Sequence, residues 1–237
     1  MSDQLGLFAP TVKWRLGEYW SVRPVNSATA DAWFGNYHYS GDRGHPGGVS
    51  YGVFAGDAVA LVATAPATNP HGVAKRYGLE EWPGNHEIVR VAVHPDAPRN
   101  TASRAVAMVC RTVAESRGKE WLFSYADTGQ DHHGGIYQAL NAVYVGVSAA
   151  CHGFRLNGKP LHPRVVVIRY GTKAWPAVRE LAALAGDVLE RIEGMNTAKH
   201  TYILPIGPPA SRRAIRQQLQ PHAKPYPKRD QAHRQAA

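Results

Sequence analysis

Residues 86–125 constrain the fold of this chain more than any other segment. HEIVRVAVHP alternates apolar and polar residues, which is typical of a half-buried strand, and the pattern ends at Pro95. A polar turn follows, and the run SRAVAMVCRTVAESRG then places its apolar residues on one face of a long helix. KEWLFSY predicts the next strand. Strands and helices that alternate in this way indicate a mixed sheet flanked by helices, and hence an α/β fold.

The chain before this segment supplies a helix and a hairpin. Residues 27–37 predict a short helix, with Ser27 as the candidate N-cap. Residues 50–66 contain two apolar runs separated by Ala55-Gly56-Asp57, which is a hairpin pattern. Residues 67–84 predict an irregular insertion with a little helix in it.

The chain after this segment continues the alternation. IYQALNA predicts a helix, YVGVSAA a strand, and VVVIRYG (residues 165–171) a strand with a continuous β-branched core. Val178 to Gly194 predicts a helix, and TYILP predicts the last strand. We therefore expect one catalytic domain over residues 1–210, followed by a tail over residues 211–237.

The tail is expected to differ from the domain in charge and in order. From Ser211 to Ala237 there are seven Lys/Arg and one acid, so the tail carries +6 of the formal net charge of +9. It is rich in Gln and Pro and poor in apolar residues, which predicts a loosely ordered segment. It serves either as a solubilising appendage or as an arm that contacts nucleic-acid phosphates. The predicted DNA contacts are Arg212, Arg213, Arg216, Lys224, Lys228 and Arg229.

Cysteine usage and hydropathy predict a cytoplasmic protein. Cys110 and Cys151 are the two cysteines, too few for a disulfide framework or a complete thiolate metal site. No run approaches the roughly 18–20 apolar residues that a membrane-spanning helix needs, and the first residues do not resemble a secretory signal. Cys110 lies in the apolar face of the predicted helix and is expected in the core rather than as a nucleophile.

The start of that helix is a candidate anion site. The first turn of a helix leaves backbone N–H groups without intrahelical partners, and they suit a phosphate or another anion. Asn100, Thr101 and Ser103 are small residues of the capping type, while Arg99 and Arg104 add positive charge. An ordinary capped helix explains the same residues, and the local sequence leaves both interpretations open.

This segment resembles the coenzyme A cradle of the GCN5-related N-acetyltransferases (GNAT superfamily), because a strand ends in Val-His-Pro and is followed by a turn and the start of a helix. The resemblance implies a GNAT-like acyltransferase fold. Those enzymes usually carry Gln/Arg-x-x-Gly-x-Gly/Ala in the turn, whereas this chain has RNTASR over Arg99–Arg104. The missing glycines argue against acetyl-CoA and leave the group donor open. GGIYQALNAVYVG is similar to the next helix of the superfamily, which makes Tyr137 a candidate general acid or donor contact, or else a packed core tyrosine.

Four ordered blocks resemble more narrowly the Mom family of bacteriophages, a GNAT-like group that hypermodifies adenine in DNA. The blocks are NYHYSG, E-x-x-R with HPDAPRNTASRA, SYADTGQDHHGGIYQA and KHTYILP, and the resemblance covers about residues 25–205. It implies transfer of a carbamoylmethyl-type group to N6 of adenine in double-stranded DNA, which protects that DNA from host restriction. An adenine inside a duplex does not present this amine to a deep pocket, so the base would have to be flipped out and stacked on aromatic residues. Trp33, Tyr37, Tyr39 and Tyr51 are candidates for this role or for the core.

The resemblance also implies an iron site formed by His38, Tyr39 and Asp127. Imidazole, phenolate and carboxylate are suitable ligands for iron, and three protein ligands leave positions open for substrate. A hydrogen bond between His38 and Asp127, or loop capping by each, is the alternative. The neighbouring His132 and His133 would add a ligand or a proton acceptor, or would be ordinary loop residues.

Two other functions fit the same residues. One is a conventional acetyltransferase of a small amine or a protein, and the other is a non-catalytic DNA-binding protein that depends on the basic tail. Glu87 and Arg90 stand three apart on the predicted strand and therefore on opposite faces, where they would anchor the sheet or orient substrate. The sequence leaves the oligomeric state open, a homodimer included.

Overall fold

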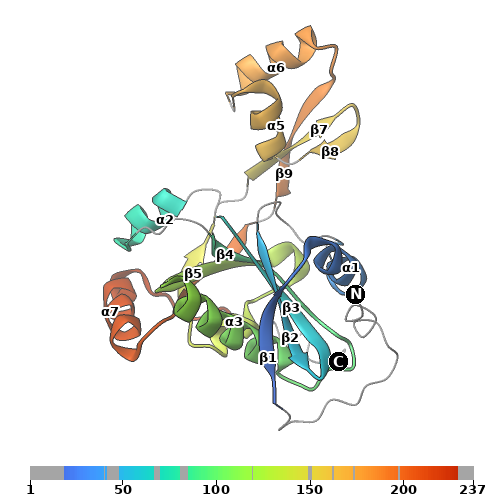
Figure 1. Ribbon diagram of the computed structural model, residues 1–237. Coiled ribbons are helices and arrows are strands. Elements are labelled where there is room, and N and C mark those ends of the chain that lie inside the picture. The colour runs from blue at the N-terminus through green and yellow to red at the C-terminus, as the bar shows by residue number, and fades with distance from the viewer. Residues whose placement is uncertain are drawn as a thin grey trace. The chain divides into compact units, whose positions relative to one another are not determined.

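The computed structural model describes residues 19–39, 41, 48–66, 70–80, 85–118, 120–148, 151–161, 163–172, 174–196 and 198–228. The chain divides into two compact units (Figure 1). The first unit comprises the described residues of Met1–Ala126, His133–Gly146 and Thr201–Ala237. The second unit comprises those of Asp127–His132 and Val147–His200.

A seven-stranded mixed sheet organises the first unit, in the strand order β1-β2-β3-β4-β5-β10-β6. The strands are β1 (Ser21–Val25), β2 (Val49–Ala55), β3 (Asp57–Pro66), β4 (Asn85–Val93), β5 (Trp121–Asp127), β6 (Val143–Val147) and β10 (Lys199–Pro205). The helices are α1 (Ser27–Tyr37), α2 (Pro70–Tyr77), α3 (Thr101–Arg117), α4 (Gly135–Gln138) and α7 (Pro209–Leu219), followed by the 3-10 turn η3 (Gln220–His222). β1 to β4 pair antiparallel in succession, and β4 pairs parallel with β5. The predicted mixed α/β sheet flanked by helices is confirmed.

Most local predictions in this unit are also confirmed. β2 and β3 form the predicted hairpin through Gly56, whose φ of 81° is the left-handed conformation that glycine adopts most readily. Helix α1 spans the predicted residues, but its N-cap is Asn26 rather than Ser27, because the Asn26 side chain accepts the Thr29 N–H at 2.8 Å. The insertion contains the short helix α2.

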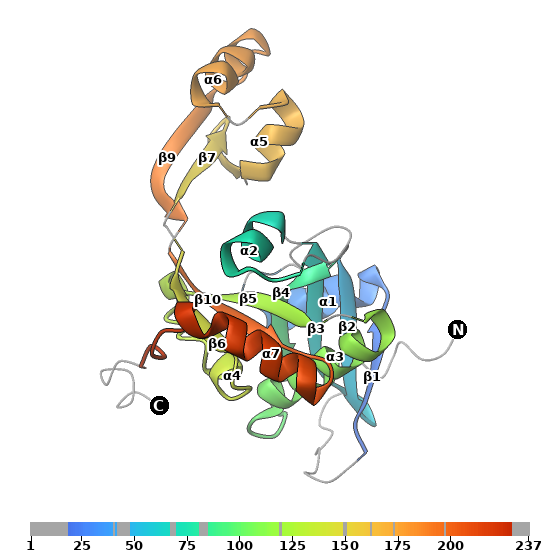
Figure 2. The same cartoon turned by 90° about the vertical axis from the view of Figure 1, so that its left-hand side faces the viewer.

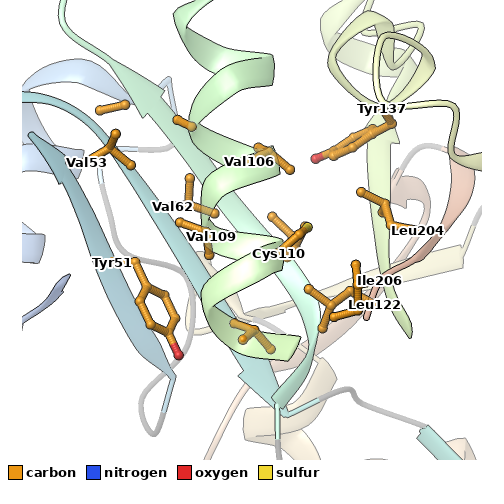
Figure 3. Close-up of a cluster of buried hydrophobic side chains, with 14 of the residues drawn as sticks. Tyr51, Val53, Val62, Val106, Val109, Cys110, Leu122, Tyr137, Leu204 and Ile206 are labelled. Atoms are coloured by element: carbon orange, nitrogen blue, oxygen red, sulfur yellow. The ribbon is translucent and has the colours of Figure 1, made fainter. Parts of the chain in front are cut away.

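Helix α3 packs on one face of this sheet and supplies the centre of the core. Val106, Val109 and Cys110 share one buried cluster with Val53 and Val62 of the hairpin and with Leu204 and Ile206 (Figure 3). Adjacent residues of a strand point to opposite faces, and Leu61, the residue before Val62 in β3, belongs to the cluster beneath α1. The sheet is therefore covered on both faces, as its long apolar strands require.

Helix α7 contradicts the expectation of a loosely ordered tail for residues 211–228. Ile215 and Leu219 stand four apart and are buried with Trp121, Phe123 and Ile203, so α7 packs over β5 and β10 (Figure 2). One apolar residue per helical turn is enough to pack a helix against a sheet. The average composition of a polar segment does not reveal so few apolar residues. Residues 229–237, with Arg229, lie outside the described part of the chain.

The second unit consists of a segment between β6 and β10 together with the short turn that follows β5. It contains η2 (Thr128–Gln130), β7 (Cys151–Leu156), β8 (Lys159–Leu161), α5 (Pro163–Tyr170), α6 (Trp175–Leu184) and β9 (Leu189–Asn196). The strands form an antiparallel sheet in the order β8-β7-β9. Phe154, Val166 and Val178 form its small core.

The prediction of a strand over residues 165–171 is wrong, because this run lies in helix α5. Val166 is buried, whereas Val165 and Ile168 are exposed, so the run has one inward face rather than two. Gly171 ends the helix with a φ of 70°, and its N–H donates to the Val167 carbonyl at 2.8 Å. The preference of β-branched residues for strands is weak enough for these contacts to override it.

The predicted helix from Val178 to Gly194 is also wrong in its second half. Helix α6 ends at Leu184, Gly186 adopts a φ of 72°, and β9 follows. The strands β7 and β8 were missed although Asn157-Gly158, the strongest hairpin dipeptide, joins them with both φ values positive.

Among the described residues, no helix combines the length and apolar character needed to cross a membrane.

Candidate active site

The parallel pair β4–β5 is paired at only two positions, Glu87 with Phe123 and Ile88 with Ser124. Ser124 lies at the second position, with no exposed surface. Its Oγ is 2.7 Å from the Ile88 carbonyl oxygen and 2.6 Å from the Tyr137 hydroxyl oxygen. A buried hydroxyl pair therefore stands where the paired residues of the two strands end.

Close packing at the start of α4 holds Tyr137 in this pair. Gly134 has a φ of 77°, and a Cβ atom there would come within 2.3 Å of the Tyr202 ring, so the chain needs glycine. Tyr202 donates a hydrogen bond to the His133 carbonyl at 2.5 Å. Gln138 Nε2 donates to the same carbonyl at 2.8 Å and lies 3.1 Å from the Tyr202 hydroxyl oxygen. These contacts fix the turn from which the Tyr137 ring projects towards α3 (Figure 3).

The surroundings of Tyr137 favour its neutral form. Burial raises the pKa of Tyr137 to about 12, and the charges of Cys110, Glu87 and Tyr39 would raise it further. These three residues come from α3, β4 and the residues after α1. Burial also raises the pKa of Cys110 to about 12, which makes this thiol a poor nucleophile and agrees with its predicted core position.

His38 and Tyr39 lie together directly after α1. Their ring centroids are 4.4 Å apart, and the His38 ring stands edge-on to Phe34 at 6.0 Å. Asp127, the third predicted iron ligand, belongs to the second unit, where its Oδ1 accepts the Gly129 N–H at 2.9 Å. Within the described part of the chain, no group of three or more His, Cys, Asp and Glu side chains is placed to hold a metal ion. Two of the three donors are therefore adjacent, and the complete triad stays a prediction.

At the start of α3, the predicted capping residues bind the turn itself. Asn100 has a φ of 69° and makes no side-chain cap. Thr101 Oγ1 donates to the Pro98 carbonyl at 2.6 Å, and Ser103 Oγ donates to the Asn100 carbonyl at 3.1 Å. Arg104 lies over the Trp20 ring, with its guanidinium carbon 4.0 Å from the ring centroid. The exposed Arg99 and this turn remain the predicted donor site.

A cavity of about 540 Å³ lies elsewhere along α3. It is lined by Ala107, Cys110, Arg111, Ala114, Glu115, Leu140, Leu204, Pro205, Ile206, Gly207, Pro208 and Arg212. None of the predicted donor-binding residues lines it. No local pattern indicates this cavity, because its walls come from segments about a hundred residues apart.

The predicted aromatic and basic residues fall into buried and exposed groups. Trp33 and Tyr51 are buried in the core, while Tyr39 is 57% exposed. On α7 the predicted DNA contacts Arg212 and Arg213 are exposed. In contrast, Arg216 donates a hydrogen bond to the Asn141 carbonyl and is half-buried; Lys224 and Lys228 are exposed.

The mixed sheet with its parallel β4–β5 pair defines the first unit as an α/β protein. An acetyltransferase of Bacillus subtilis in complex with CoA has 11% identity and a TM-score of 0.42, covering 79% of this chain and 99% of that chain. The apo form of an agmatine N-acetyltransferase mutant has 12% identity and a TM-score of 0.44, covering 79% and 100%.

The chain belongs to the Mom protein family, which matches residues 19–228. The methylcarbamoylase mom of Escherichia phage Mu is 32% identical to it over 114 residues. This alignment covers 47% of the chain and 46% of the phage Mu protein, so the chain spans about half the length of that relative. The family resemblance expected from the four sequence blocks is confirmed.

Proposed function

We propose that this protein is a DNA-modifying transferase that attaches a carbamoylmethyl-type group to the N6 amine of adenine in duplex DNA. Membership of the Mom family over residues 19–228 carries the proposal. The name of the phage Mu relative, methylcarbamoylase, supports transfer of a small amide-containing group. The modification would protect the DNA from host restriction.

The described residues supply groups that such a reaction requires. A flipped adenine needs an accessible aromatic surface, and Tyr39 is 57% exposed beside His38. Tyr39 and the buried hydroxyl pair of Ser124 and Tyr137 both belong to the first unit. Exposed Arg212 and Arg213 on α7 would contact phosphates outside this region.

Nucleoside analysis tests the proposal directly. Plasmid DNA from cells that express the protein is digested and examined by mass spectrometry, with Tyr39→Ala as the site variant and exposed Gln217→Ala as the matched control. We expect a new adenosine-derived nucleoside with the wild type and with the control but not with Tyr39→Ala. The modified DNA should also resist adenine-sensitive restriction endonucleases. Unmodified DNA that the protein nevertheless binds would indicate a DNA-binding protein without this activity. Acetyl transfer to a small amine or protein, with unmodified DNA, would indicate a conventional acetyltransferase.

We further propose that His38, Tyr39 and Asp127 hold iron. Their imidazole, phenolate and carboxylate groups suit this metal, and the adjacent His38 and Tyr39 rings supply two donors from one segment. Iron with three protein ligands would provide open coordination positions near the substrate. Elemental analysis of the purified protein should find iron that is lost in His38→Ala and Asp127→Ala but kept in His132→Ala. Equal iron in all variants would overturn this assignment.

A further inference from the structure

The number of protons available determines which residue donates in the hydrogen bond between Ser124 and Tyr137. Ser124 Oγ lies within hydrogen-bond distance of two oxygens, the Ile88 carbonyl at 2.7 Å and the Tyr137 hydroxyl at 2.6 Å. A serine hydroxyl has one proton, and a carbonyl oxygen can only accept. Ser124 must therefore donate to Ile88. The short contact with Tyr137 then requires the tyrosine proton, so Tyr137 donates to Ser124.

This direction leaves the Tyr137 oxygen as an acceptor. Its proton is committed to Ser124, while its lone pairs remain able to accept a hydrogen bond. Burial raises the pKa of Tyr137 to about 12, so the hydroxyl keeps its proton near neutral pH. A substrate group that meets this oxygen has to bring its own N–H or O–H.

The chain of hydroxyls ends at a backbone carbonyl, which determines what it can do. A proton that passed from Tyr137 to Ser124 would have no basic group to receive it next, because an amide carbonyl is not a base at neutral pH. The chain therefore orients the tyrosine and does not conduct a proton. Since Ile88 and Ser124 are the last paired residues of β4 and β5, the orientation is tied to the point where their pairing ends.

We propose that Ser124 is a positioning residue that turns the Tyr137 hydroxyl into a hydrogen-bond acceptor for an N–H of the substrate amine. The inference rests on the proposed function, in which the substrate amine is the exocyclic N6 group of adenine. That amine carries two N–H groups. One of them can donate a hydrogen bond to Tyr137 while the nitrogen lone pair faces the group that is to be transferred. Ser124 itself does not touch the substrate and acts only through the tyrosine.

The test is a double-mutant cycle with Ser124→Ala, Tyr137→Phe and the double variant, assayed for steady-state modification of an adenine-containing duplex. Ser124→Ala should lower kcat by about tenfold with KM for DNA nearly unchanged, since one orienting hydrogen bond is removed. The double variant should be no slower than Tyr137→Phe alone, because Ser124 acts through the tyrosine. Ser124→Thr, which keeps a hydroxyl, should recover most of the rate.

Thr64→Val is the matched control, because Thr64 Oγ1 also donates to a backbone carbonyl within the sheet, that of Val49. It should lower the thermal unfolding midpoint without lowering kcat. Losses that multiply in the double variant, or full activity of folded Ser124→Ala, would overturn the positioning role while leaving the proposed function intact. If Ser124→Ala does not fold, the comparison of Ser124→Thr with the wild type decides: an unchanged kcat supports the role, and a kcat as low as that of Tyr137→Phe refutes it. A wild-type protein that leaves DNA unmodified refutes the proposed function instead.

Discussion

Replacement of Leu219 by alanine tests whether the basic C-terminal segment belongs to the core of the first unit. Leu219 has no exposed surface and shares a cluster with Trp121, Phe123 and Ile203. Core Leu→Ala substitutions cost about 2–5 kcal/mol, through reduced burial and the cavity that remains. The last turn of a helix relaxes more easily than its middle, so we expect about 3 kcal/mol here.

For a unit of this size, 1 kcal/mol shifts the unfolding midpoint by about 2–4 °C, so Leu219→Ala should lower it by about 6–12 °C. Near-ultraviolet circular dichroism is the assay, because Trp121 of the same cluster reports on this packing. Gln217→Ala, on the exposed side of α7, should stay within about 0.5 kcal/mol of the wild type. Equal midpoints for the two variants would refute the packing of α7 and restore the loosely ordered tail.

Three further predictions concern the surface, the helix start and the thiol. Arg212→Ala with Arg213→Ala should flatten the log–log salt dependence of duplex binding by about 0.9 for each phosphate interaction that is removed, and an unchanged slope would exclude α7 from the DNA interface. Ser103→Tyr should abolish modification while DNA binding persists, with Ser103→Ala much milder; a stable, active tyrosine variant would place the donor elsewhere. Cys110, whose pKa is raised to about 12, should stay protonated at pH 8. In a Cys151→Ser background, alkylation of Cys110 by iodoacetamide should therefore be about 10³-fold slower in the folded protein than in denaturant, and equal rates would contradict its burial.

The sequence by itself determined the elements whose pattern repeats locally. The alternation in β4 and the helical period of α3 follow from which side chains face the core, and each pattern is complete within its own segment. The hairpin at Gly56 and the strand that ends at Asp127 are also determined by patterns within their own segments. The four blocks also identified the family, because residue types in a fixed order are recognisable without knowledge of which side chains touch.

Tertiary contacts decided the elements in which local preference was weak or misleading. The β-branched run of α5 became a helix because it buries one face, at Val166, against Phe154 and Val178. Helix α7 is held by two apolar residues whose partners Trp121 and Phe123 lie about ninety residues earlier in the chain. Propensity differences of a few tenths of a kcal/mol per residue cannot outweigh the burial of such side chains.

The candidate site depends on tertiary structure even more strongly. Tyr137 was a candidate from its place in a sequence block, but its partner Ser124 was not, since nothing in the local pattern shows which hydroxyl meets which. Their contact exists because α4 returns over β5 at the position where Ile88 pairs with Ser124. Hydrogen-bond direction is a property of the assembled oxygens and their protons, so only the fold could assign it.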